Sequence, residues 1–136
     1  MITAVDSSVL LDIFKNDPKF CQRSADAMRQ SIATGSLVAC EIVWAEVSSA
    51  FADKKQFADI MEQLGVGFSP MSASSAIASG AAWLDYRKNG GNRERMIPDF
   101  LIGAHALNQC DRLLTRDRGF YRKYFANLAV LDPTEK

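Results

Sequence analysis

Four carboxylates occupy positions from which they can reach a common edge of a sheet. Asp6 follows the apolar run at residues 2–5, and Asp117 comes shortly after the apolar run at residues 113–115. Glu46 lies in a helical pattern six residues beyond Cys40, and Asp99 stands at the start of another. Ligands of open α/β sheets bind outside the carboxyl ends of the strands. We therefore expect these four acids to converge on one cleft.

Carboxylates that share a cleft repel one another, and their pKa values rise unless a cation balances them. Oxygen ligands with open coordination positions suit Mg²⁺ or Mn²⁺. One or two such ions can activate a water molecule and stabilise the leaving oxygen of a phosphodiester. The pattern therefore predicts metal-assisted hydrolysis at a phosphate.

The segments that would position these acids alternate between strand and helix. Short apolar runs predict strands at 2–5, 37–40, 66–69, 113–115 and 128–131. Helical spacing and stop signals predict helices at about 9–15, 19–34, 41–51, 53–64, 72–86 and 99–108, with a short helical or irregular stretch at 118–125. Ser7 or Ser8 is the expected N-cap of the first helix. The alternation predicts an α/β fold, a three-layer α/β/α sandwich whose central parallel sheet has four or five short strands.

Length and composition favour one cytoplasmic domain that spans residues 1–136. The chain shows no secretory signal and no apolar run of 18 residues, so no membrane association is expected. Cys21, Cys40 and Cys110 are scattered and form no CxxC pair, which indicates a reducing compartment and small core residues.

Charge is divided unevenly along the chain, although the net charge is zero. Residues 1–86 carry 6 basic and 10 acidic side chains, whereas residues 87–123 carry 9 basic and 4 acidic ones. The basic stretch is either a polyanion-binding surface or a set of solvated helix faces. Under the first interpretation the residues expected to contact phosphate are Arg93, Arg95, Arg116 and Arg118.

Four motifs, in order, resemble the PIN-domain nucleases over nearly the whole chain. Residues 6–12 (DSSVLLD) resemble the family's opening, and residues 43–47 (VWAEV) place Glu46 as its second acid. Residues 97–106 (IPDFLIGAHA) place Asp99 as the third, and residues 114–120 (LTRDRGF) place Asp117 as the fourth. A compact, free-standing PIN domain is most similar to the VapC-like toxins of toxin–antitoxin modules.

The resemblance implies a Mg²⁺- or Mn²⁺-dependent endoribonuclease that forms a homodimer and is inhibited by a cognate antitoxin. Asp6 and Asp99 are then the main metal ligands, and Glu46 and Asp117 complete the site directly or through water. Ser7, Ser8 and Thr115 are expected to orient carboxylates or water by hydrogen bonds.

Simpler explanations remain for each acid taken alone. Asp6 suits an N-cap, and Asp99 suits the first turn of a helix, where an acid complements the macrodipole. Glu41 is the alternative second acid, whereas Asp12 fits a solvent or cap position. His105 falls on a different helix face from Asp99, so a packing role is expected for it. The small residues of the helix at 72–86 are expected to pack inside the fold, with a dimer contact as the alternative.

Two other functions are compatible with an aspartate after the first strand. One is an aspartate-dependent phosphotransferase, but these enzymes need an acid two residues later, where this chain has Ser8, and a lysine near the later acid. The other is a PIN-like binding module without activity.

Overall fold

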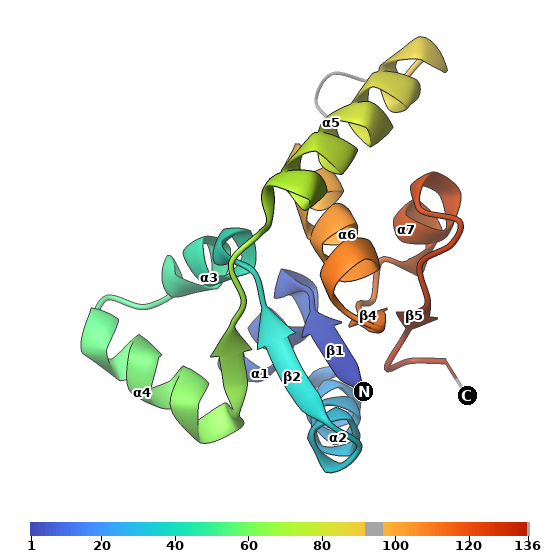
Figure 1. Ribbon diagram of the computed structural model, residues 1–136. Coiled ribbons are helices and arrows are strands. Elements are labelled where there is room, and N and C mark those ends of the chain that lie inside the picture. Colours follow the sequence, from blue (N-terminus) through green and yellow to red (C-terminus); the bar gives the residue numbers. More distant parts are fainter. Residues whose placement is uncertain (92–96, 136) are drawn as a thin grey trace.

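A five-stranded parallel sheet forms the centre of the computed structural model, which describes residues 1–91 and 97–135, the side chain of Ile97 excepted. The strand order is β3-β2-β1-β4-β5, and every neighbouring pair is parallel (Figure 1). The strands are β1 (Ile2–Val5), β2 (Ser36–Ala39), β3 (Val66–Phe68), β4 (Arg112–Leu114) and β5 (Val130–Leu131). The predicted α/β class and strand number are therefore confirmed.

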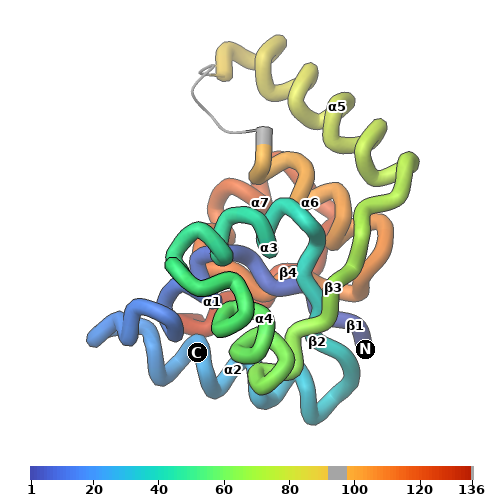
Figure 2. The backbone as a smooth tube through the Cα atoms, turned by 90° about the vertical axis from the view of Figure 1, so that its left-hand side faces the viewer, coloured from blue at the N-terminus to red at the C-terminus, as the bar shows by residue number. Residues whose placement is uncertain are grey.

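Seven helices connect and cover the described strands. They are α1 (Ser7–Phe14), α2 (Cys21–Ala33), α3 (Glu41–Ser48), α4 (Lys54–Leu64), α5 (Ala73–Lys88), α6 (Ile97–Gln109) and α7 (Arg118–Tyr124). Figure 2 shows α5, α6 and α7 gathered on one side of the sheet and α1, α2 and α4 on the other. Within the described residues, no helix is long and apolar enough to span a membrane.

The central strands are buried because helices cover both faces of the sheet. Thr3, Ala4 and Val5 of β1 are at most 2% exposed, as are Leu113 and Leu114 of β4. Such strands appear in the sequence as continuous apolar runs rather than as an alternation. This is why the runs at 2–5 and 113–115 could be recognised before the fold was known.

The order of the strands creates a crevice at β1. The chain leaves β1 toward β2 and β3, then returns to the other side of β1 to form β4 and β5. Connections that leave two adjacent strands in opposite directions open a crevice at the carboxyl ends of those strands. The ends of β1 and β4 stay hydrogen-bonded at this point, because the Asp6 N–H donates to the Leu114 carbonyl at 2.9 Å.

The predicted cap of α1 was wrong. The helix begins at Ser7, and Asp6 is the N-cap, with its side chain accepting from the Ser7 N–H. Because β1 extends to Val5, only one residue separates strand from helix. That residue must both end the strand and accept from the helix, so neither serine is available as the cap.

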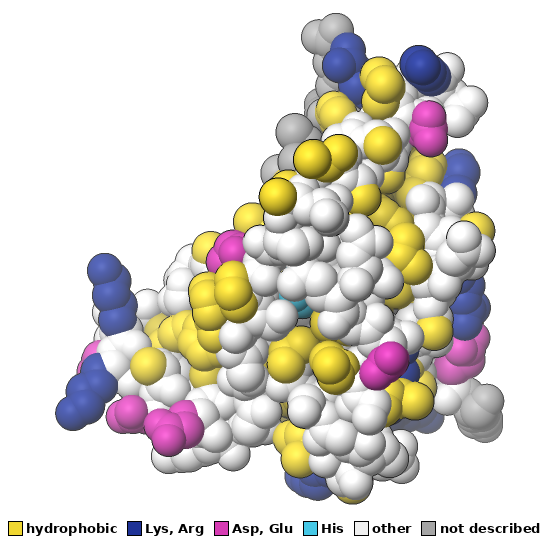
Figure 3. Space-filling view, in the orientation of Figure 1, with side chains coloured by type: hydrophobic (Ala, Val, Ile, Leu, Met, Phe, Trp, Pro, Cys, Tyr) yellow, Lys and Arg dark blue, Asp and Glu magenta, His cyan; other side chains and the backbone are white. Residues whose placement is uncertain are grey.

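Helix α5 packs its small side chains against α6 and exposes apolar ones elsewhere. Ser75 and Ser79 are buried, and Ser75 donates to Gln109 of α6 at 2.7 Å. On the exposed surface, Ile77 is 75% exposed and Leu84 is 50% exposed. Hydrophobic side chains are visible along this helix in Figure 3, where it extends beyond the sheet. The expected packing inside the fold is present only in part, because Ala73, Ala76, Gly80 and Ala81 are exposed.

His105 has the predicted packing role. It is 1% exposed in α6, and its Nε2 lies 3.0 Å from the Ser69 hydroxyl. Burial lowers the pKa of the imidazole, so its neutral form is favoured. Through this contact, His105 connects the segment after β3 to α6.

Two helical glycines give a test of this packing. A Cβ at Gly103 would lie 2.5 Å from the Phe125 ring, whereas a Cβ at Gly80 would meet nothing within 4 Å. We expect Gly103→Ala to lower the free energy of unfolding by about 1–3 kcal/mol through overpacking. Gly80→Ala should raise it by about 0.5–1 kcal/mol through helix propensity. Urea denaturation measures both, and equal stabilisation by the two changes would contradict the close approach of α6 to Phe125.

Candidate active site

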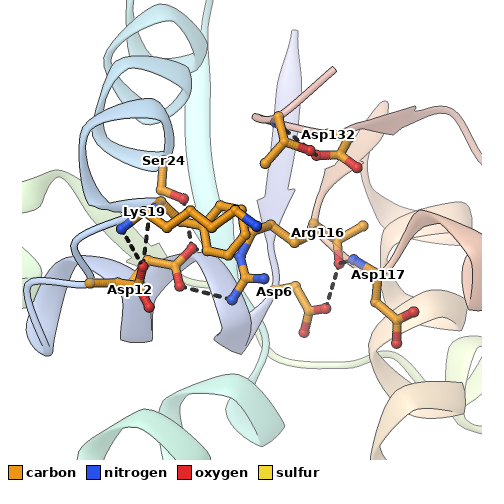
Figure 4. Close-up of polar contacts among 11 residues, drawn as sticks. Asp6, Asp12, Lys19, Ser24, Arg116, Asp117 and Asp132 are labelled. Carbon is orange, nitrogen blue, oxygen red and sulfur yellow. Dashed lines mark hydrogen bonds and ion pairs between the residues drawn. The ribbon is translucent and has the colours of Figure 1, made fainter.

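Asp6 is a buried carboxylate at the carboxyl end of β1. It is 7% exposed, and each oxygen accepts one hydrogen bond: Oδ1 from the Ser7 N–H at 2.8 Å and Oδ2 from the Thr115 hydroxyl at 2.7 Å. Figure 4 shows this carboxylate between the residues that follow β4 and those of α1. Burial raises the pKa of Asp6 to about 6, although both hydrogen bonds oppose the shift.

Glu46 and Asp99 are close enough to act on Asp6 through their charges. Each raises the pKa of Asp6 further, Asp99 by more than Glu46. Glu46 is exposed on α3, and its Oε1 accepts from the Ser7 hydroxyl at 2.8 Å. Ser7 therefore donates its N–H to one acid and its hydroxyl to another. Asp99 stands half-buried in the first turn of α6.

Asp117 lies directly before α7. It is exposed, and its N–H donates to the Thr115 hydroxyl oxygen at 3.0 Å. The carboxylates of Asp6 and Asp117 point the same way in Figure 4. Asp6, Asp99 and Asp117 also share an electrostatic neighbour, since all three raise the pKa of the Tyr121 hydroxyl. The four acids thus surround one edge of the sheet.

The carboxylate oxygens of these acids are suitable ligands for a hard divalent cation. Carboxylate oxygens are the ligands that Mg²⁺ and Mn²⁺ prefer, and the hydrogen bonds to Asp6 leave each of its oxygens a further lone pair. As the side chains stand, no three acids, histidines or cysteines of the described residues are disposed to hold a metal ion. Glu46 and Asp117 are exposed, so their carboxylates have room to rotate toward Asp6.

Comparison with protein families gives one assignment. The model described as "PIN domain" matches residues 3–126. The chain belongs to the PIN domain family. A comparison with curated protein sequences gives no match.

Solved structures similar to this PIN domain include chains of three complexes. VapBC2 from Rickettsia felis, bound to a promoter DNA fragment, gives a TM-score of 0.75 at 18% identity, covering 97% of this chain and 98% of the other. VapBC-1 from nontypeable Haemophilus influenzae gives 0.74 at 20%, covering 99% and 100%. A toxin–antitoxin complex from Klebsiella pneumoniae gives 0.65 at 20%, covering 98% and 99%. At these identities, the likeness establishes the shared fold.

Arg116 of this PIN domain, one of the expected phosphate contacts, is bound to Asp12. Its Nε donates to Asp12 Oδ2 at 2.7 Å and its second nitrogen to Oδ1 at 2.9 Å, and the guanidinium lies 4.1 Å from the Phe20 ring centroid. Ser24 adds a hydrogen bond to Asp12 at 2.8 Å. Figure 4 shows this cluster beside Asp6.

The expectation that Asp12 faces solvent or caps a helix was wrong, because it is 3% exposed. A buried charge requires a partner, and Arg116 supplies one from the segment after β4. The available signal was the position of Asp12 inside the apolar run of residues 9–14, where an unpaired carboxylate is costly.

Other basic side chains of the segment at 87–123 also have acidic partners. Arg118 contacts Asp132 at 3.3 Å and Glu135 at 2.9 Å, and Arg122 contacts Glu135 at 3.0 Å. Asp132 is 4% exposed and follows β5. Much of the charge division seen in the sequence is thus cancelled in space. Arg93 and Arg95 lie outside the described residues.

Glu41 and Ser8, which were also candidates for the site, differ in their hydrogen bonds. Both oxygens of Glu41 accept from the Met71 N–H at 3.1 Å, so this acid anchors the segment after β3. The Ser8 hydroxyl is buried and has no hydrogen-bond partner among the described residues. The orienting contacts at the acids therefore come from Ser7 and Thr115, and a role for Ser8 stays a prediction.

Because the pKa of Asp6 is raised, we expect its ionisation to lower the free energy of unfolding in a pH-dependent way. The unfolded carboxyl titrates near 4 and the folded one near 6, so folding retains a proton between these values and stability falls as pH rises through them. In chelator-treated protein at pH 8, Asp6→Asn should raise the free energy of unfolding by roughly 1–3 kcal/mol. The gain should shrink as pH falls from 6 to 4. Urea titrations across pH measure it.

Asp17→Asn is the matched control for that series. Hydrogen bonds from the Phe20 and Lys19 N–H groups lower the pKa of Asp17, so removing its charge should destabilise the protein above that pKa. A loss of stability in Asp6→Asn at pH 8, or a gain that is independent of pH, would contradict the desolvation of Asp6.

Loss of the Asp12–Arg116 ion pair should lower the free energy of unfolding far more than loss of a surface ion pair. Arg116→Met leaves Asp12 buried without its counter-charge and should lower the free energy of unfolding by about 2–4 kcal/mol. Arg29→Met removes the pair with Asp26, whose side chains are 70% and 53% exposed, and should cost less than about 1 kcal/mol. Equal effects in thermal and urea unfolding would refute the structural role of Arg116, and Asp12→Leu combined with Arg116→Met should recover part of the loss.

Proposed function

We propose that this PIN domain is a Mg²⁺- or Mn²⁺-dependent endoribonuclease that hydrolyses RNA phosphodiesters. The observation that carries the proposal is the state of Asp6. It is buried, its pKa is raised to about 6, and two of the neighbours that raise it are themselves acids. A cation bound among these carboxylates removes that electrostatic cost, so the site favours a metal ion.

The acids receive distinct roles in this proposal. Asp6 and Asp99 are the main ligands, and Glu46 and Asp117 act directly or through water. When bound, a divalent cation lowers the pKa of a water molecule and balances the charge that develops on the phosphate. Thr115 and Ser7 donate to the Asp6 carboxylate from two sides, so this ligand is oriented before a cation arrives, and the Ser7 hydroxyl also donates to Glu46.

The RNA phosphates require basic partners near the acids. We propose Arg93 and Arg95, which precede Asp99 in sequence, as phosphate contacts. Arg116 and Arg118 are the other two proposed contacts. Both are bound to carboxylates in the structure, so each would have to share its guanidinium with the phosphate. Arg118 is the better placed of the two to do so, since its side chain is 43% exposed against 29% for Arg116.

We further propose that the protein is the toxin of a toxin–antitoxin pair and acts in the cytoplasm, where RNA is available. Support comes from the similar structures, one of which is described as a toxin–antitoxin complex, and from the match along almost the full length of both chains. The proposed partners are a cognate antitoxin and a second copy of the chain. The exposed Ile77 and Leu84 on α5 support a protein contact at that helix.

A PIN-fold binding module without activity is the second proposal. It is favoured by the present positions of the acids, of which no three among the described residues are disposed to hold a metal ion. Calorimetry with Mn²⁺ separates the two proposals, since the nuclease requires binding that depends on Asp6 and the module does not.

Neutralising either proposed main ligand should abolish cleavage. Asp99→Asn and Asp6→Asn remove charge without changing size, and we expect each to lower the rate of RNA cleavage in Mg²⁺ by about 100-fold or more. Asp26→Asn, an exposed acid on α2, is the control and should cleave as the parent does. Folded Asp99→Asn and Asp6→Asn proteins that cleave at the parent rate would show that the acids are not catalytic.

A further inference from the structure

Tyr121 of α7 is the least explained side chain near the acids. It is 0% exposed, and its hydroxyl oxygen makes no hydrogen bond of standard geometry with any described residue. Buried hydroxyl groups nearly always have a partner, because a lost hydrogen bond to water must be replaced. A phenylalanine would meet the packing needs here, as Phe120 and Phe125 do beside it. The hydroxyl is therefore the part of this residue that needs an explanation.

Tyr121 lies one helical turn after Asp117, and its N–H donates to the Asp117 carbonyl at 3.4 Å. Burial raises the pKa of the Tyr121 hydroxyl well above 10, and the charges of Asp6, Asp99 and Asp117 raise it further. Weak hydrogen bonding to Asp6 makes the smallest contribution, so the two groups are near each other without a well-formed bond. The phenol is thus neutral, and it adds no negative charge to an edge that already carries several.

Asp6 makes no hydrogen bond of standard geometry with this hydroxyl. Its Oδ1 already accepts from the Ser7 N–H and its Oδ2 from the Thr115 hydroxyl. A cation at this carboxylate would take a remaining lone pair of Asp6. The divalent cations expected here retain several water ligands, and a phenol can accept a hydrogen bond from one water while it donates to a carboxylate.

We propose that Tyr121 is a positioning residue whose hydroxyl forms its hydrogen bond when a divalent cation binds, with a water ligand of that cation. The proposal rests on the proposed function, because it requires a cation among Asp6, Asp99 and Asp117. The Tyr121 hydroxyl should then strengthen cation binding without stabilising the metal-free protein, whereas a structural hydroxyl would stabilise the metal-free protein. The metal-free protein carries the cost of an unpartnered hydroxyl, and the metal-bound protein gains the bond.

The test compares Tyr121→Phe with the parent in the absence and presence of Mn²⁺. In chelator-treated protein, Tyr121→Phe should unfold at the same temperature as the parent or slightly above it. By calorimetry, its dissociation constant for Mn²⁺ alone should be about 3- to 10-fold higher, the range expected for loss of one hydrogen bond. In RNA cleavage, the Mn²⁺ concentration for half-maximal rate should rise by a similar factor.

Tyr124→Phe is the matched control. It makes the same change three residues later on α7, at a half-buried ring. It should leave the affinity for Mn²⁺ unchanged.

Each outcome decides between the possibilities. A lower unfolding temperature of metal-free Tyr121→Phe with unchanged Mn²⁺ affinity would show a structural hydrogen bond and overturn the inference. Unchanged unfolding and unchanged affinity would also overturn it, while leaving the proposed function intact. A parent protein that binds no Mn²⁺ would overturn both.

Discussion

A buried carboxylate with no basic partner among the described residues is the constraint around which this sheet edge is arranged. Asp6 ends the central strand, caps α1 and receives two hydrogen bonds, yet the described residues place no cationic side chain against it. Desolvation outweighs the two hydrogen bonds, so its pKa rises rather than falls. The fold therefore carries a cost at this point that packing alone does not remove.

The segment that follows β4 shows how differently two buried acids are treated. Thr115 donates a neutral hydrogen bond to Asp6, whereas Arg116, the next residue, gives its guanidinium to Asp12. Asp6 and Asp12 stand at the start and near the end of the short helix α1. Asp12 is paired with an arginine, whereas Asp6 receives only neutral hydrogen bonds among the described residues.

The sequence was sufficient for the architecture because the relevant signals are local. Fully apolar runs mark the buried strands, Gly65 with its φ of 76° ends α4, and Asp53 and Ser72 cap their helices. The grouping of the four acids also followed, because parallel strands place their carboxyl ends at one edge. The N-cap of α1 did not follow, since Asp6, Ser7 and Ser8 are all suitable caps until the first residue of the helix is known.

The sequence could not predict which polar groups from distant segments form hydrogen bonds or ion pairs with one another. Asp12 meets Arg116 across 104 positions, and Glu41 meets the backbone of Met71. Nothing local distinguishes an arginine bound to an acid from one that faces solvent, so the basic stretch was open to two interpretations. The contacts of Arg116, Arg118 and Arg122 with acids show that sequence charge overstates the positive surface here.

Tyr121 illustrates the same limit at the site itself. In the sequence it stands close to Phe120, Tyr124 and Phe125, and no local signal distinguishes it from them. Only its position in three dimensions separates it from the others, because its hydroxyl is buried near three acids and makes no hydrogen bond of standard geometry with the described residues. Under the role proposed for Tyr121, a hydrated cation would balance the carboxylates, and one of its water ligands would donate to the phenol oxygen.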